Sequence, residues 1–319
     1  MVCDPSRYLF YSELINLLAK IDNDGQAKYT LQIAQNNLSR KDFFRIKRDY
    51  KKSFNKAYYV NNFRFTPIYS DNYNSGIDAE FIEVFNLPFK TSENSKPKKG
   101  LGLKSSIQLS NFLPSGSGQW NKLNLSITQT DYPSSTGDVG AYSLSYENSL
   151  RDQSSIIYSI TNVRFKQQNF LTNYLIGYKF KYSQKIDLLL GLIKKNYVDD
   201  FQGGEGVKIS LRTKESFLSG GFLESYSANT NTYSFDKIGL SSKRRIFYKR
   251  TGYDFSIESS YYKGRFEAFG KKRNDQSLIL NFYIGDYFGF YSKLSFVKRK
   301  SNLDIFETNN INFEIYLNW

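Results

Sequence analysis

The last nine residues constrain the fold more than any other stretch of the chain. Apolar side chains stand at every second position there, namely Ile311, Phe313, Ile315, Leu317 and Trp319, with polar or amphipathic residues between them. This period of two predicts a strand with one apolar and one polar face. The terminal strand of an open soluble sheet would leave one edge unpaired. A strand that closes a transmembrane barrel bonds both edges and turns its apolar row to lipid.

The same alternation recurs from Tyr58 onwards. It is regular at residues 101–110, 122–128, 142–147, 253–258 and 277–284. Further strands are expected at residues 58–69, 154–165, 169–183, 185–197, 206–214, 216–227, 231–243 and 287–300. With the closing strand the count is about 14, and an even number of strands that each cross a tilted bilayer is typical of bacterial barrels. We therefore predict an all-β transmembrane barrel of antiparallel strands at residues 57–319.

The expected connections between these strands alternate in length. Short ones fall at residues 114–119, 152–154, 183–185, 214–215 and 285–286, and longer ones at 70–99, 132–138, 199–206, 265–274 and 301–308. The connection at 166–168 breaks the series, because it is short where a long loop is due. Short turns on one side and longer loops on the other are typical of the periplasmic and outer faces of an outer-membrane barrel.

The composition favours strands over membrane helices. Aromatic residues make up 17% of the chain, with 26 Tyr and 27 Phe, and the mean hydropathy is −0.53. No apolar run approaches the roughly 20 residues that a membrane helix needs. Tyr and Phe favour strands, and Tyr suits the aromatic girdles of barrels at the membrane interfaces. A Tyr-rich soluble sandwich would have the same composition, so this alternative stays open at this point.

The chain has no histidine, and Cys3 is its one cysteine. A Ser-His-Asp or Cys-His pair, a His-ligated zinc site and an intrachain disulfide are therefore excluded. We expect no catalytic residue, no cofactor and no metal site. Asp199 and Asp200 would bind a divalent cation only with partners that the sequence does not identify. The nearby Gly203, Gly204 and Gly206 lack a following Gly-Lys-Ser/Thr, so they are interpreted as a loop.

The chain is basic, with 44 Lys and Arg against 30 Asp and Glu and a net charge of +14. The basic residues are spread along the sequence and form no nucleic-acid-binding module, so no nucleic-acid partner is expected. An anionic membrane surface is a partner of matching charge. Lys96, Lys98 and Lys99 lie in the long segment after the first strand. They are interpreted either as a solvated charge run or as a contact for acidic lipopolysaccharide groups.

Residues 1–56 have a helical pattern instead. Asp4 and Pro5 are suited to begin a helix, and the Asp22–Gly25 break separates it from a second helix near residues 26–38. Ser39 and Asp42 predict the capping box of a third helix that runs to about Phe54. One side of the first helix is expected to be apolar, through Tyr8, Leu9, Leu14, Leu17, Leu18 and Ile21. Two short antiparallel helices around a Gly turn are similar to a tetratricopeptide unit.

The third helix and its flank are strongly basic. They carry Lys41, Arg45, Lys47, Arg48, Lys51, Lys52 and Lys56. Such a run is either a solvated face or a collar against anionic headgroups at the periplasmic rim of the barrel. The first residues of the sequence show no secretory signal, so on the barrel hypothesis we expect upstream residues to be missing.

Two resemblances add to this interpretation. The closing residues Ile315, Leu317 and Trp319 resemble the C-terminal signal by which the barrel-assembly machinery recognises outer-membrane barrels. The order of parts resembles the surface lipoprotein assembly modifier family, which has a periplasmic tetratricopeptide region, a basic linking helix and a fourteen-stranded barrel. The similar stretches are Phe63–Gly76, Lys99–Ser106, Arg273–Asp275, Lys300–Asn302 and Asn309–Asn310 with the final strand.

The resemblance implies a non-enzymatic translocon or assembly factor in the bacterial outer membrane, with a lipoprotein substrate and with its helices in the periplasm. Two other hypotheses remain. One is a passive pore for small solutes, since every barrel of this size has a wet lumen. The other is a soluble all-β binding or adhesive protein with a helical cap.

Overall fold

The computed structural model describes residues 8–77, 79–84, 87–115, 119–134, 137–150, 154–183, 186–198, 203–213, 217–229, 233–248, 251–268, 270–287 and 290–317. Three helices come first: α1 (Tyr8–Lys20), α2 (Asp24–Asn37) and α3 (Arg40–Ser53). The remaining elements are β1 (Tyr58–Ser70), β2 (Phe81–Val84), β3 (Leu87–Lys90), η1 (Glu93–Ser95), β4 (Gly100–Pro114), β5 (Trp120–Asp131), β6 (Val139–Ser149), β7 (Ser155–Phe165), β8 (Gln168–Ser183), β9 (Ile186–Tyr197), β10 (Gly204–Thr213), β11 (Phe217–Ala228), β12 (Phe235–Tyr248), β13 (Thr251–Ala268), β14 (Lys271–Tyr287), β15 (Phe290–Ser301), η5 (Asp304–Phe306) and β16 (Thr308–Leu317).

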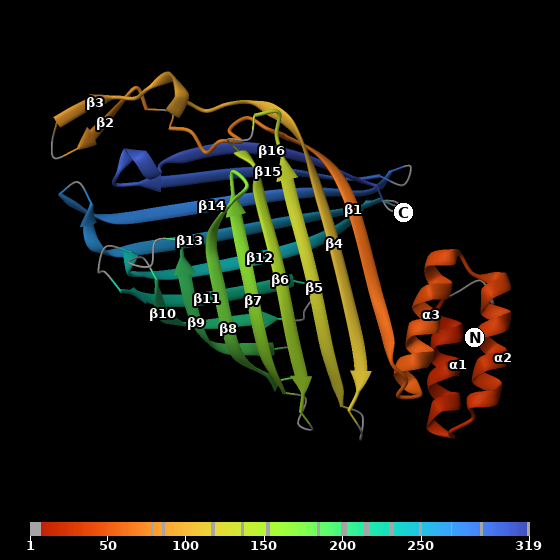
Figure 1. Ribbon diagram of the computed structural model, residues 1–319. Helices are drawn as coiled ribbons and strands as arrows, with labels where there is room; N and C mark the ends of the chain where they lie inside the picture. Colours follow the sequence, from red (N-terminus) through yellow and green to blue (C-terminus); the bar gives the residue numbers. More distant parts are fainter. Residues whose placement is uncertain are drawn as a thin grey trace.

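Within these ranges, fourteen strands close into one barrel (Figure 1). β4 to β16 follow each other around the wall in chain order, and β1 lies between β4 and β16. Every neighbouring pair is antiparallel, with registers such as Phe63↔Ile107 and Leu125↔Leu144. The fold predicted from the alternating pattern is therefore confirmed, including the number of strands and the closing role of the last one.

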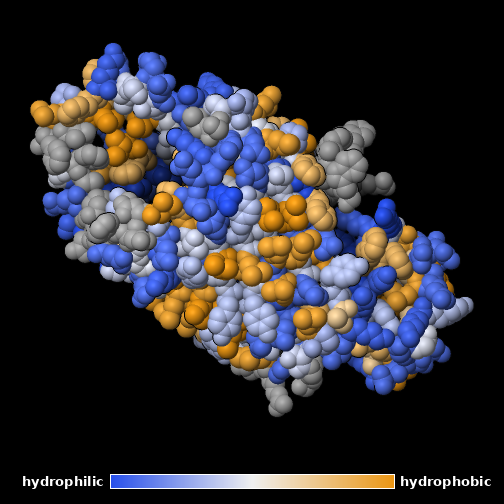
Figure 2. Space-filling view, in the orientation of Figure 1, coloured by the Kyte–Doolittle hydropathy of each residue, from blue (hydrophilic) through white to orange (hydrophobic). Residues whose placement is uncertain are grey.

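The barrel has an apolar outside and a wet inside. Successive side chains of a strand point to opposite faces, and most of the strongly exposed large side chains on the strands are apolar. Leu101 is 69% exposed, Leu192 64% and Leu240 68%. Figure 2 shows such side chains in patches over the barrel wall. The total accessible surface is 20242 Å², against roughly 13,600 Å² for a compact monomer of this mass. A soluble sandwich around a dry core is therefore excluded.

The two ends of the barrel differ, as predicted. At the end that also carries the helices and the C-terminal end of β16, strands follow each other closely: β8 ends at Ser183 and β9 begins at Ile186. At the other end the chain makes longer connections, and residues 71–99 include the β2–β3 hairpin. One short connection at this end, at Lys166 and Gln167, is a tight turn with φ of 50° and 63°. Positive φ at both central residues is the mark of a two-residue hairpin turn.

Three predicted connections are wrong in whole or in part. The turn predicted at residues 285–286 lies inside β14, which ends at Tyr287. Residues 265–274 belong largely to β13 and β14, which pair up to Ala268↔Lys271. Their charged residues suit strands that extend beyond lipid into water, and Arg265 there pairs with Asp236 at 2.6 Å. Gly204 and Gly206 lie in β10. A Cβ on either glycine would lie within 2.3 Å of a β11 carbonyl oxygen, so glycine lets the two strands approach closely.

The three helices form their own small core. Tyr11, Ile15, Leu18, Ala27, Ala34, Ile46 and Tyr50 are buried together. Asn23 caps α2 and Ser39 caps α3, the latter as predicted from Ser39 and Asp42. The apolar side predicted for α1 is wrong in part, because Leu9, Leu17 and Ile21 are 65%, 58% and 69% exposed. Tyr11, Ile15 and Leu18, spaced by four and three residues, supply the packed face instead. The predicted start at Asp4 and Pro5 lies outside the described residues.

Asp24 joins α2 to the chain that follows α3. Its carboxylate accepts hydrogen bonds from Lys56 Nζ at 2.8 Å and from the Tyr50 hydroxyl. These bonds, the one from Lys56 foremost, hold the pKa of Asp24 well below its usual range. A carboxyl with a depressed folded-state pKa stabilises the fold above its unfolded pKa of about 4, and this contribution is lost as the pH falls through the folded value.

We therefore expect Asp24→Asn to lower the thermal midpoint of the helical signal at pH 7 and to weaken its decline below about pH 4. The measurement is circular dichroism at 222 nm on the full chain in detergent micelles. Asp22→Asn is the matched control, because Asp22 is exposed and its left-handed φ of 52° suits asparagine. Equal behaviour of the two variants would contradict this assignment.

Candidate functional site

The lumen wall next to the junction of β1 and β16 carries a compact charge cluster. Glu314 on β16 lies 3.3 Å from Lys104 Nζ on β4 and 3.4 Å from Lys293 Nζ on β15. The Glu314 side chain is 6% exposed, whereas Lys104 and Lys293 are 34% and 21% exposed. Because β4 and β15 each flank the β1–β16 pair, these contacts tie four consecutive strands together on the inner face.

A second inner cluster combines cations with aromatic rings. Lys195 on β9 pairs with Glu224 on β11 at 2.6 Å and lies 4.8 Å from the ring centroids of Tyr226 and Phe235. Phe235 stacks on Tyr262 with centroids 5.0 Å apart. Such contacts stabilise a partly desolvated lysine.

The aromatic series continues toward the long-connection end. Arg273 lies over the Tyr262 ring at 4.7 Å and over the Phe306 ring at 3.5 Å. Its guanidinium also binds both carboxylate oxygens of Asp275, which is nearly fully buried. The result is a rigid patch on the inner wall of β9 to β14. No sequence pattern indicates this patch, because its members come from strands whose neighbours only the register defines.

The described lumen face has more basic than acidic side chains. The registers place Arg64, Lys104, Lys122, Lys179, Lys181, Lys195, Lys208, Arg212, Lys237, Lys293 and Arg299 on this face. Arg273 belongs to it through its contacts with Tyr262 and Asp275. They place Glu147, Asp187, Glu224, Asp254, Glu258, Asp275 and Glu314 there as well. Fixed positive charge along a channel raises the local concentration of anions.

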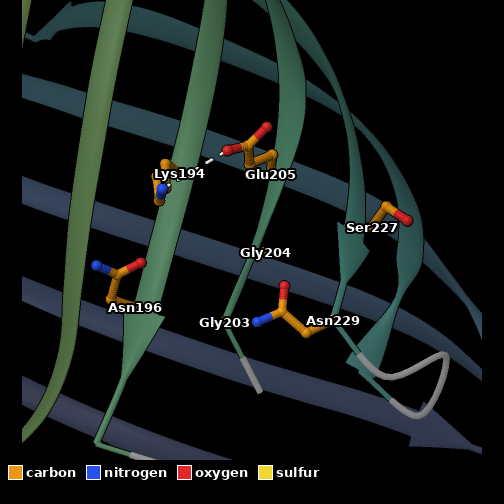
Figure 3. Close-up of a pocket in the computed structure, with 7 residues that line it drawn as sticks. All are labelled: Lys194, Asn196, Gly203, Gly204, Glu205, Ser227 and Asn229. Atoms are coloured by element: carbon orange, nitrogen blue, oxygen red, sulfur yellow. Dashed lines mark ion pairs between the residues drawn. The ribbon is translucent and has the colours of Figure 1, made fainter. Parts of the chain in front are cut away.

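The outer side of the wall has a polar notch at its long-connection end (Figure 3). It is a cavity of about 510 Å³ lined by Lys194, Asn196, Gly203, Gly204, Glu205, Ser227 and Asn229. Lys194 and Glu205 form an ion pair at 3.6 Å with side chains that are 56% and 77% exposed. An ion pair this exposed contributes little to stability, so the notch is a water-facing rim feature.

The residues singled out in the sequence are dispersed. Ile315 and Leu317 lie in β16, and Trp319 lies outside the described residues, as do Asp199 and Asp200. Lys96 pairs with Glu93 at 2.7 Å in the 71–99 segment, and the backbone of Lys98 bonds to Asn74 and Tyr73. In the described part of the chain, no group of three or more Cys, Asp or Glu is arranged to hold a metal ion.

The basic helix α3 lies against the start of β1. Lys51 Nζ is 5.8 Å from the ring centroid of Tyr59, and Phe44, Lys47, Arg48, Tyr58 and Tyr59 line a small groove there together with Lys51. Tyr59 is 71% exposed on the outer face of the barrel. A row of cations beside an exposed tyrosine at the end of the apolar wall fits a membrane interface with anionic headgroups.

Within the described ranges, none of the helices is long and apolar enough to span a membrane. The closed antiparallel wall, its apolar exterior and its polar lumen define the class of protein: a transmembrane β-barrel.

Comparisons with known proteins give likenesses of architecture. No protein-family model matches the sequence, and no curated protein sequence matches it. Among solved structures, Pseudomonas aeruginosa OccK10 (OpdN) is similar with a TM-score of 0.46 and 8% identity, over 81% of this chain and 99% of that one. The anion-selective porin from Comamonas acidovorans has a TM-score of 0.43 and 9% identity, over 82% of this chain and 98% of that one. A structure described as a bacterial polysaccharide outer membrane secretin has a TM-score of 0.39 and 10% identity, over 82% of this chain and 98% of that one. The barrel assignment rests on this chain's own strand pairing.

Proposed function

We propose that this chain is a bacterial outer-membrane barrel that helps to move surface-exposed lipoproteins or related secreted proteins across the membrane, without covalent chemistry. The single observation that carries this is the position of the helical unit. It joins β1 at the short-turn end, which in outer-membrane barrels faces the periplasm, and Figure 1 shows it beside that end of the wall.

The helical unit presents an exposed apolar face. Leu9 and Leu17 of α1, and Ile21 directly after its end, are 65%, 58% and 69% exposed, and Tyr29 and Ile33 of α2 are 64% and 38% exposed. Contiguous exposed apolar side chains mark interaction sites. A pore for small solutes has no need of such a face. A barrel that receives a polypeptide from the periplasm has a direct use for it, because unfolded chains expose apolar residues.

Deleting the gene is expected to leave lipoproteins inside the cell, with at least a tenfold loss of their cleavage by protease added to intact cells. Complementation with the wild-type gene restores cleavage, and Leu17→Asp/Ile21→Asp restores much less, because two carboxylates disrupt the apolar face. Glu13→Gln, an exposed position of α1 one turn before Leu17, is the matched control. Unchanged lipoprotein exposure after deletion would refute the proposal.

A second candidate is a passive pore that favours anions. The specific observation is the excess of basic side chains on the described lumen face. Purified protein in planar bilayers would then show steady conductance with anion preference, and no protein partner would be needed. This outcome together with normal lipoprotein exposure in the deletion strain would favour the pore over the translocon.

A further inference from the structure

The junction of β1 and β16 is the shortest strand pairing in the described barrel. Its register contains three pairs, Ile68↔Glu314, Tyr69↔Phe313 and Ser70↔Asn312. The opposite edge of β1 pairs with β4 along the whole strand, from Tyr58↔Phe112 to Ser70↔Gly100. Beyond Ser70 the two chains stay joined, because Asp71 bonds to Ile311 through both its N–H and its side chain. The junction is thus closed at the long-connection end.

The pairing stops beside a proline. Pro67 has no N–H to donate, and it immediately precedes Ile68, the last paired residue of β1 at this junction. The register with β4 continues through Pro67 without a shift. Proline in a sheet is confined to edges and irregular places for this reason. In Figure 1, β1 descends to the helices while β16 runs to the C-terminus on a different course.

The segment Tyr58–Thr66 therefore has one edge with no strand partner among the described residues. Its outer side chains include Phe63 and Phe65, which are 55% and 60% exposed. Its lumen row includes Asn62, Arg64 and Thr66. The Arg64 side chain is exposed, and within the described ranges it makes no hydrogen bond or ion pair; its backbone lies opposite Ser106 of β4. An unpaired strand edge inside a bilayer is costly, since each unsatisfied backbone group costs several kcal/mol there.

We propose that this edge accepts an extended strand of the transported polypeptide by β-augmentation. The incoming strand pairs its backbone with Tyr58–Thr66, turns alternate apolar residues to lipid beside Phe63 and Phe65, and places an acidic residue opposite Arg64. Backbone pairing supplies affinity for many sequences, and the side-chain rows supply the selection. The inference rests on the proposed function, and it identifies the wall of the barrel, instead of the lumen alone, as the place of contact.

A direct test uses the full chain in detergent micelles with a photoreactive benzoylphenylalanine in place of Phe65. The probe is a synthetic ten-residue peptide of alternating apolar and polar residues with one central Glu. We expect at least fivefold more labelling by this peptide than by a scrambled peptide of the same composition. The same photoreactive residue in place of Leu125, which is exposed on the fully paired β5, is the control and should show no difference.

Charge exchange tests the role of Arg64. Arg64→Glu is expected to abolish the preference for the Glu peptide and to create one for the same peptide with Lys at that position. Equal labelling by ordered and scrambled peptides at Phe65 overturns the inference, whatever the deletion strain shows.

A test in cells uses an engineered disulfide to hold β1 and β16 together. In a Cys3→Ser background, Thr66→Cys/Tyr316→Cys places a disulfide two positions beyond the last observed pair. Ser106→Cys/Thr128→Cys places one across β4 and β5, which are already paired. With each disulfide confirmed by mass, the first lock is expected to reduce lipoprotein exposure at least tenfold until a reductant is added, and the second to leave it unchanged. Normal exposure with the first lock closed overturns the inference while leaving the proposed function in place.

Discussion

Leu192→Arg is expected to destabilise the barrel by about 2–4 kcal/mol, because arginine on the lipid face near the middle of a transmembrane strand must be placed in hydrocarbon. Leu192 lies centrally in β9 and is 64% exposed. In a water-soluble sheet, arginine at so exposed a site would change stability by less than about 0.5 kcal/mol. The substitution therefore tests whether lipid covers the outer face of this barrel.

The measurement is a denaturant titration of the protein folded into lipid vesicles, followed by the heat-dependent shift in gel mobility. Ser210→Arg is the matched control, because Ser210 lies on the neighbouring β10 with its side chain toward the lumen. Since the lumen is wet, this second arginine should cost less than about 1 kcal/mol. Equal losses for the two variants would contradict the assignment of outer and inner faces.

Glu314→Gln is expected to lower the free energy of unfolding of the barrel by about 2–3 kcal/mol. The carboxylate is 6% exposed and bonds to both Lys104 and Lys293, so its removal leaves two ammonium groups close together without a counter-charge. Breaking a buried pair typically costs about 3–5 kcal/mol. The lower value follows here because water reaches Lys104, whose side chain is 34% exposed. Glu314 also belongs to one of the three pairs of the junction, so the loss should concentrate there.

The same denaturant titration measures this effect, and hydrogen exchange at Ile68 to Ser70 locates it. Glu147→Gln is the control, since its ion pair with Lys179 is 3.5 Å long and both side chains are more exposed, at 29% and 44%. We expect Glu147→Gln to lower the free energy of unfolding by less than about 1 kcal/mol. A loss from Glu314→Gln no larger than the control's would show that the cluster does not hold the junction together.

The alternating rows explain why so much of the barrel was predictable. Side chains such as Leu123, Leu125 and Ile127 must face lipid, and their polar neighbours must face water, so each strand carries its own two-residue signature. Helix caps are equally local, and Ser39 with Asp42 predicted the start of α3 correctly. Errors arose where exposure to water removes this constraint. The charged residues near Arg265 have the pattern of a loop, because a strand outside the membrane needs no apolar row.

The inner surfaces were not predictable in the same way. Lys195 meets Glu224, and Arg273 meets Tyr262, only because the registers of β9 to β14 bring those positions together. Phe306 reaches Arg273 from η5, in the connection between β15 and β16. The sequence around a polar lumen-facing residue does not indicate which residue on another strand it contacts. The residues expected on one apolar side of the first helix divide between the packed face and the exposed surface for a related reason, since an apolar helix has several faces and packing selects one of them.

The sequence by itself determined that this chain forms a barrel of about fourteen strands with an apolar outside. Each strand has one face in lipid and one in water, so each strand separately shows alternating apolar and polar residues. Only the tertiary structure decided how the first and last strands meet. Three pairs, a proline and a shared glutamate define that junction, and they lie more than two hundred residues apart in the chain. Contacts between such distant positions depend on closure of the whole barrel, which no local pattern encodes.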